Sequence, residues 1–178
     1  MAEKSDGRGE RGSEGADVGM TGPVDSPSVD VYLRSLSPPA GTHDRQAEII
    51  DRLSELSSSD RLDSVSVSVW GERVCLCEVC AGTGSGRAAL DRLGEFQNWV
   101  ETVEGGELPF EHRTIRSEYT HTEQGVIVPP CVTMAVYSGD TLVGVFPHSE
   151  SGETRTVTDA LEALEAALEP GRSLPANR

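Results

Sequence analysis

Three of the four cysteines lie within six residues of one another. Cys75, Cys77 and Cys80 form a C-x-C-x-x-C pattern, and Cys131 follows much later. Thiolates are the preferred ligands of structural zinc and of iron-sulfur clusters. On a strand, Cys75 and Cys77 point to the same face, and Cys80 lies just beyond it. The pattern therefore raises the hypothesis of a zinc or iron-sulfur site completed by Cys131 or by a histidine.

Two other interpretations of the same cysteines stay open. A zinc site ordinarily has two paired ligand motifs, and here the second pair is missing. Cys77 and Cys80 also match the spacing of a thiol-redox pair, which requires a helix start after a strand. The simplest interpretation, which we favour, is that all four are small, partly buried thiols beside the core. On that interpretation no cofactor is expected.

A glycine-rich stretch, GTGSGR, follows the cysteines at residues 82–87. It matches neither the dinucleotide-binding pattern nor the P-loop, because Arg87 stands where the third glycine of the former belongs. Backbone amides before a helix can hold an anion, and Arg87 would lie near it. A flexible connector is the simpler expectation.

The sequence contains no recognisable catalytic motif. The chain has no G-x-S-x-G, no H-E-x-x-H and no paired carboxylates at a set spacing, so we expect no enzyme. The most basic patch surrounds one predicted strand and contains His112, Arg113, Arg116 and His121. It is a candidate contact for an anion or a phosphate backbone, although alternation places these side chains on two faces.

The elements that must position these residues follow from hydrophobic periodicity. Alternation predicts strands within residues 29–36, 62–70, 73–79, 110–120, 126–137 and 141–146. Helical spacing predicts a helix from Thr42, a second capped by Ser85, and a third from Thr158. The expected buried residues of these helices are Ile49, Ile50, Leu53 and Leu56; Ala89, Leu93, Phe96, Val100 and Val103; and Leu161, Leu164 and Leu168.

These elements predict an α+β fold. We expect residues 73–79 to return from a turn at Gly71 as the hairpin partner of 62–70. The order βαββαβ matches the ferredoxin-like sandwich, with two helices on one face of an antiparallel sheet. A β-hairpin and a C-terminal helix would extend it. A strand edge near 126–128 would permit a homodimer.

The domain organisation follows from composition. Residues 1–27 contain mostly Gly, Ser and charged side chains, which predicts a disordered tail. Residues 28–169 have the size of one domain. Residues 170–178 resemble the N-terminal tail and are expected to be flexible.

Composition also indicates the habitat. The chain has 30 acidic and 15 basic residues and a net charge of −15, and Lys4 is its single lysine. Abundant carboxylates with arginine in place of lysine are suited to molar salt, where charge repulsion is screened within about 3 Å. We therefore expect a cytoplasmic protein of a halophilic archaeon. No stretch has the apolar length of a membrane span or the pattern of a signal peptide, so a membrane partner is not expected.

Several segments resemble a family of small haloarchaeal proteins labelled helix-turn-helix domain proteins. They include VDVYLRSLSPPAG, RQAEIIDRLSEL, VSVSVWGERVC, LDRLGEFQNWVE, VIVPPCVTMAVYSGDTLVGVFPH and TVTDALEALE, which together cover most of residues 28–169. The resemblance does not depend on Cys77 and Cys80. It implies a DNA-binding transcription regulator, for which Arg87, Arg92, Arg113 and Arg116 are the candidate contacts.

Three classes of function therefore remain. The first is a regulatory or interaction module that binds DNA. The second is a metal or thiol-redox module that uses the cysteines. The third is a small-molecule sensor that uses the open face of the sheet.

Overall fold

A computed structural model of the chain describes residues 19–24, 26–116, 118–119 and 121–168. Within them, the helices are α1 (Thr42–Ser58), α2 (Glu78–Ala81), α3 (Gly84–Val100) and α4 (Val157–Ala167). The strands are β1 (Pro27–Leu33), β2 (Ser64–Val69), β3 (Val74–Cys75), β4 (Glu111–Arg116), β5 (Glu123–Val128), β6 (Val132–Ser138), β7 (Thr141–Phe146), β8 (His148–Glu150) and β9 (Glu153–Arg155). None of the helices in this part of the chain is long and apolar enough to cross a membrane.

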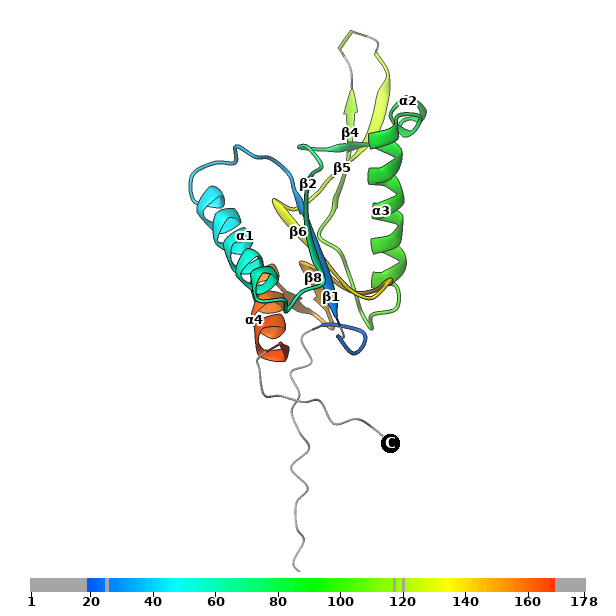
Figure 1. Ribbon diagram of the computed structural model, residues 1–178. Coiled ribbons are helices and arrows are strands. Elements are labelled where there is room, and N and C mark those ends of the chain that lie inside the picture. Colours follow the sequence, from blue (N-terminus) through cyan, green and yellow to red (C-terminus); the bar gives the residue numbers. More distant parts are fainter. Residues whose placement is uncertain (1–18, 25, 117, 120, 169–178) are drawn as a thin grey trace, which may run out of the picture.

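A four-stranded sheet in the order β2-β1-β6-β7 forms the centre of the fold (Figure 1). β1 continues through α1 into β2, and these two strands pair in parallel. β6 pairs antiparallel with both β1 and β7. Gly139, in the turn between β6 and β7, has a φ of 57°, a conformation that glycine adopts without strain. Because the sheet contains one parallel pair and two antiparallel pairs of strands, it is mixed. The predicted α+β class is confirmed.

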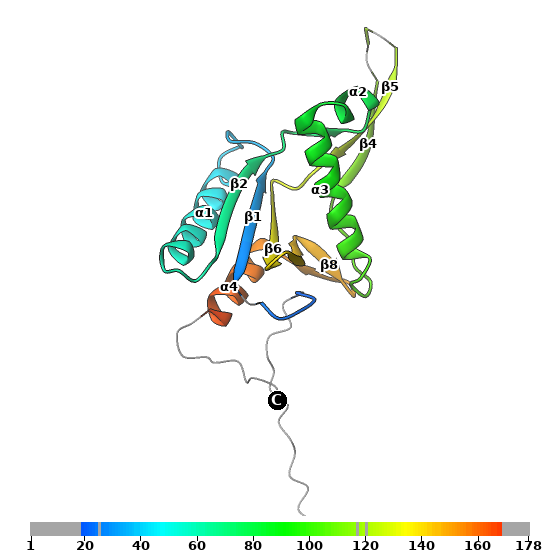
Figure 2. The ribbon, with the colours of Figure 1, turned by 45° about the vertical axis from the view of Figure 1, so that its right-hand side comes forward.

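Helices cover both faces of this sheet, whereas the ferredoxin-like plan places them on one. α1 and α4 lie against one face, and α3 lies against the other (Figures 1 and 2). Along β1, Val31 contacts the α1 side and Tyr32 the α3 side; along β6, Met134 and Ala135 divide in the same way. A strand buried on both faces is apolar at consecutive positions, which explains the run of β6. The open sheet face that the sensor hypothesis assumed is therefore limited to β2, whose residues are mostly exposed.

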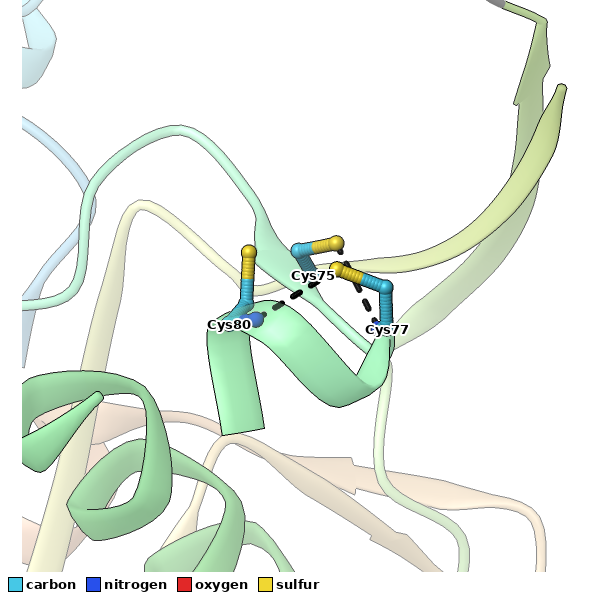
Figure 3. A group of neighbouring side chains, drawn as sticks. All are labelled: Cys75, Cys77 and Cys80. Carbon is cyan, nitrogen blue, oxygen red and sulfur yellow. Dashed lines mark hydrogen bonds between the residues drawn. The ribbon is translucent and has the colours of Figure 1, made fainter. Parts of the chain in front are cut away.

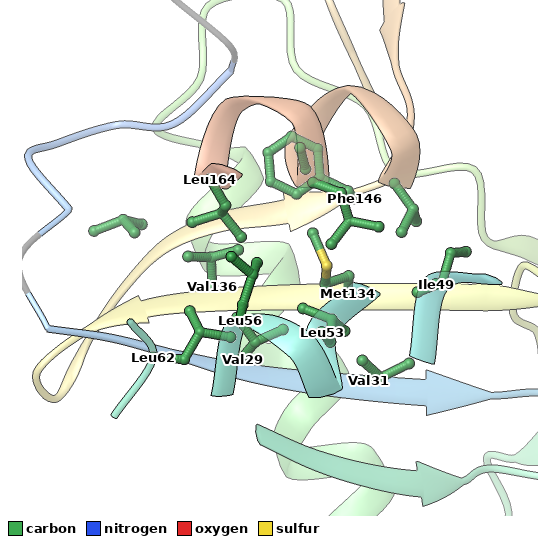
Figure 4. Close-up of a cluster of buried hydrophobic side chains, with 14 of the residues drawn as sticks. Val29, Val31, Ile49, Leu53, Leu56, Leu62, Met134, Val136, Phe146 and Leu164 are labelled. Carbon is green, nitrogen blue, oxygen red and sulfur yellow. The ribbon is translucent and has the colours of Figure 1, made fainter. Parts of the chain in front are cut away.

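The larger core cluster lies between the sheet and the pair of helices α1 and α4 (Figure 4). Its buried members are Val29, Val31, Leu33, Ile49, Leu53, Leu56, Leu62, Met134, Val136, Val143, Phe146, Val157, Ala160, Leu161 and Leu164. The predicted apolar positions of the first and last helices thus largely face this core. Arg52 of α1 and Glu165 of α4 join the same two helices through two hydrogen bonds of 2.8 Å.

A second, three-stranded sheet in the order β3-β5-β4 extends beyond the end of the first (Figures 1 and 2). Val74 of β3 and Ile127 of β5 pack against Leu93 of α3, which attaches this sheet to the long helix. β5 is the central strand, so the predicted dimer edge near residues 126–128 is wrong: Val126 is 2% exposed between two neighbours.

The predicted hairpin between residues 62–70 and 73–79 is also wrong. β2 pairs with β1, whereas β3 pairs with β5 in the other sheet. Gly71, with a φ of 84°, lies in the turn where the chain passes from one sheet to the other. Alternation identifies a strand but not its partner, because a period of two says nothing about which strand is paired.

The chain contacts the core before the predicted domain boundary at residue 28. Thr21 donates its backbone N–H to the carbonyl of Val143 at 2.8 Å and accepts a hydrogen bond from Trp99 Nε1 at 3.1 Å. Met20 and Val24 pack against the larger core cluster. The rest of the predicted N-terminal tail, residues 1–18, and the predicted tail 170–178 lie outside the described residues.

Candidate functional site

Three cysteine side chains converge where β3 ends and α2 begins (Figure 3). The sulfur atoms of Cys75, Cys77 and Cys80 all lie within 4.8 Å of one another. β3 holds Cys75, Cys77 is the N-cap residue of α2, and Cys80 lies one turn into that helix. We call these three residues the thiol cluster. The predicted strand 73–79 is thus cut short at Cys75, and a helical turn folds Cys80 back towards the other two.

Backbone amides hold two of the three sulfur atoms. The N–H of Cys77 donates to Cys75 Sγ, and the N–H of Cys80 donates to Cys77 Sγ, each at 3.4 Å. Cys75 Sγ also lies 3.9 Å from Gln124 Oε1 of β5. The cluster is therefore fixed by the backbone of α2 and by the second sheet, and all three cysteines are partly exposed.

The thiols differ in acidity because they share hydrogen bonds. The N–H of Cys80 is the main cause that lowers the pKa of Cys77 to about 7, and hydrogen bonds with the Cys75 and Cys80 thiols add to it. Hydrogen bonds to Cys77 and then to Cys75 raise the pKa of Cys80 to about 12. Of these two thiols, Cys77 therefore loses its proton before Cys80 does.

Cys131 does not join this cluster. It lies just before β6, where its sulfur accepts a hydrogen bond from Arg34 Nη2 at 3.0 Å and its carbonyl accepts one from Gln46. The four-cysteine site considered from the sequence is therefore reduced to three thiols. The described histidines do not belong to the group of potential ligands either.

The glycine-rich stretch forms a turn and the start of a helix. Gly82 and Thr83 separate α2 from α3, and the Thr83 hydroxyl accepts the N–H of Gly86 at 3.0 Å while it donates to the Cys80 carbonyl at 2.7 Å. Thr83, and not the predicted Ser85, therefore caps α3. At Gly86 a Cβ atom would lie 2.0 Å from the Cys80 carbonyl oxygen, so a glycine is needed for α2 to pack this closely on α3.

The two candidate arginines of α3 have different surroundings. Arg87 is exposed on the first turn of the helix. Arg92 is partly buried, pairs with Glu95, and donates to the Tyr137 hydroxyl at 2.9 Å. Its guanidinium also lies 5.8 Å from the centre of the Tyr137 ring. Arg92 thus joins α3 to β6, whereas Arg87 faces solvent.

Arg113 and Arg116 lie on opposite faces of β4, as alternation requires. Arg113 forms an exposed ion pair with Glu111 and lines a cavity of about 440 Å³. Arg34 and Arg73 line the same cavity. The sequence pattern does not reveal these two, because the three arginines meet only through the pairing of β3, β5 and β4 and through the end of β1.

Comparison with known families adds one finding. The family described as helix-turn-helix domain matches residues 22–169, which include all the described helices and strands. The chain belongs to the helix-turn-helix domain family. The helix-turn-helix label of the resemblance noted in the sequence is thereby confirmed, while the haloarchaeal origin stays a prediction. No curated protein and no solved structure matches the chain.

A helix-turn-helix motif consists of two consecutive helices joined by a turn. α1 packs against the central sheet and is followed by β2, so it is not the first helix of such a pair. Among the described helices, only α2 and α3 follow each other without an intervening strand, and a turn of two residues joins them. α2 has four residues, so it is little more than a single helical turn before α3.

Proposed function

We propose that the chain is a DNA-binding regulatory module without enzymatic activity that acts in the cytoplasm. Membership of the helix-turn-helix domain family is the observation that carries this proposal. In proteins with this motif, the N-terminal residues of the second helix contact base edges in the major groove, while the first helix crosses the backbone. The equivalent residues here are those at the start of α3.

The surface around the start of α3 has the groups that such contacts need. Thr83 and Ser85 carry hydroxyls, and Arg87 extends from the first turn into solvent. Arginine recognises guanine edges and phosphates through its planar set of donors. Of the four candidate arginines, we assign the DNA contact to Arg87 first. Arg92 and Arg113 are engaged with Glu95 and Glu111, and Arg116 belongs to β4 and not to α3.

The acidic character of the chain restricts the conditions of binding. A net charge of −15 repels a polyanion at low ionic strength. At about 1 M salt the Debye length falls to roughly 3 Å, so distant carboxylates no longer act on the phosphates while direct hydrogen bonds remain. We therefore propose that the module works in concentrated salt, as expected for a halophilic protein, and reads DNA by short contacts.

The test compares two exposed helical arginines. A random duplex pool is selected against the full chain at several KCl concentrations, and the recovered duplex is titrated by fluorescence anisotropy. Arg87→Ala should weaken binding by about 1–3 kcal/mol, or roughly fivefold to 150-fold. Arg45→Ala, which removes an exposed arginine of α1, should leave it unchanged.

Two results would contradict the proposal. One is that no duplex is recovered at any KCl concentration. The other is an equal loss of affinity in the Arg87→Ala and Arg45→Ala variants, which would show that the start of α3 does not contact the DNA.

A further inference from the structure

We propose that the thiol cluster binds one thiophilic metal ion, Zn²⁺ or Cu⁺, through the sulfur atoms of Cys75, Cys77 and Cys80. The fourth coordination position faces solvent. This site does not depend on whether the chain binds DNA. It is carried by the convergence of three sulfur atoms from a strand end and a helical turn.

The separation of the sulfur atoms is close to what a metal ion requires. Zn–S bonds of about 2.3 Å place tetrahedral ligands about 3.8 Å apart. The three sulfur atoms already lie within 4.8 Å of one another. Small rotations of the three side chains therefore close the site, and the backbone of β3 and α2 can stay in place.

The backbone supplies the groups that surround a metal-bound thiolate. Hydrogen bonds from N–H groups orient the ligands of a metal and tune their charge. Here the N–H of Cys77 donates to Cys75 Sγ and that of Cys80 donates to Cys77 Sγ. Both amides stay directed at the sulfur atoms when the thiols become thiolates, so the protein has formed part of the outer shell before any ion arrives.

A route for the ion and a source of positive charge lie beside the cluster. Cys75 and Cys80 line a cavity of about 560 Å³ together with Arg73 and Arg92. Three thiolates carry one more negative charge than Zn²⁺ neutralises and two more than Cu⁺ neutralises. Arg92 is already paired with Glu95, so Arg73 is the guanidinium that offsets part of this excess, which favours the charged complex.

The number of ligands limits which metals fit. Iron-sulfur clusters are ordinarily held by four cysteines. Cys131 is bound to Arg34 and does not belong to the cluster, so a fourth thiolate is missing within the described residues. Soft sulfur ligands select Zn²⁺ and Cu⁺ among the common ions, and both tolerate three protein ligands. The two ions are distinguished by experiment.

The experiment uses the full chain, reduced and freed of metal. It is titrated anaerobically with Zn²⁺ in one arm and with Cu⁺ in the other, each against a chromophoric chelator of known affinity. We expect one ion per chain in at least one arm. Cys77→Ser and Cys75→Ser should each weaken binding of that ion at least a hundredfold, and Cys131→Ser, the matched control, should bind it like the original chain.

Three results would overturn the site. They are failure of the reduced chain to compete for either ion, an equal loss in the Cys131→Ser variant, and full affinity in both Cys75→Ser and Cys77→Ser. Circular dichroism and thermal unfolding of each variant check the fold. Since the cysteines are partly exposed, we expect the serine variants to stay folded. A disulfide between two of the three cysteines in the chain that fails to bind either ion would identify a redox pair instead.

Discussion

The contact between α2 and α3 can be tested with two glycines of the same helix. At Gly94, in the middle of α3, a Cβ atom would meet nothing within 4 Å. Gly94→Ala should therefore stabilise the chain by the difference in helix propensity, about 0.8–1 kcal/mol. At Gly86 a Cβ atom would lie 2.0 Å from the Cys80 carbonyl oxygen and 2.8 Å from its carbon, and these backbone atoms cannot yield without moving α2.

The two substitutions should therefore have opposite effects. Overpacking of this kind typically lowers the free energy of unfolding by about 1–3 kcal/mol. At Gly86 this loss exceeds the gain in helix propensity that an alanine brings. A change of 1 kcal/mol shifts the melting temperature by about 2–4 °C in a chain of this size. We expect Gly94→Ala to melt higher and Gly86→Ala to melt lower than the original chain, with faster amide exchange at residues 78–83 in Gly86→Ala. An equal rise in the melting temperature of both variants would refute the close contact.

Three further predictions concern the rest of the fold. Thr156→Ala removes a capping box in which the Thr156 hydroxyl accepts the N–H of Asp159 at 3.2 Å, and urea unfolding should show a loss of about 1 kcal/mol, against a smaller loss for Thr158→Ala. Trp99→Phe removes the 3.1 Å hydrogen bond to Thr21 and should speed amide exchange at Thr21, whereas Trp70→Phe should not; equal exchange would contradict the docking of residues 20–24. His148 is fully buried, and its Nδ1 lies 2.7 Å from the Val145 carbonyl oxygen. Burial lowers the pKa of His148, and the positive charge of Arg155 lowers it further, although the charge of Glu150 acts in the opposite direction. The unfolded chain then binds a proton more readily, so stability should fall as the pH drops below about 6.5 towards the folded pKa, and His148→Asn should lessen this slope; an unchanged slope would exclude His148 as its source.

The helices could be located from the sequence because their apolar positions repeat with helical spacing. Leu53 and Leu56 of α1 and Leu161 and Leu164 of α4 are buried, as predicted. The ends were less accurate. Thr83, and not Ser85, caps α3, because the choice between two hydroxyl residues depends on the position of the Cys80 carbonyl, which the turn after α2 determines.

The pairing of strands could not be obtained from local patterns. Residues 64–69 alternate clearly, yet nothing in them indicates that their partner is β1 and not the next strand along the chain. The hairpin of β8 and β9 was not predicted at all, since three-residue strands leave almost no period to detect.

The candidate site was predicted in part. The C-x-C-x-x-C spacing identified the three thiols that converge, but Cys131 could be separated from them only once its contact with Arg34 was known. The same holds for the basic residues. Arg92 and Arg113 look alike in sequence to Arg87, and only the structure shows that they are paired with carboxylates while Arg87 is exposed on the first turn of α3.

The central claim is that the α2–α3 unit contacts DNA, and hydrogen–deuterium exchange of the full chain with and without the selected duplex tests it most directly. DNA should slow exchange at residues 78–90, whereas exchange in α1 and α4 should stay unchanged. Protection confined to α1 and α4, with residues 78–90 unaffected, would contradict it.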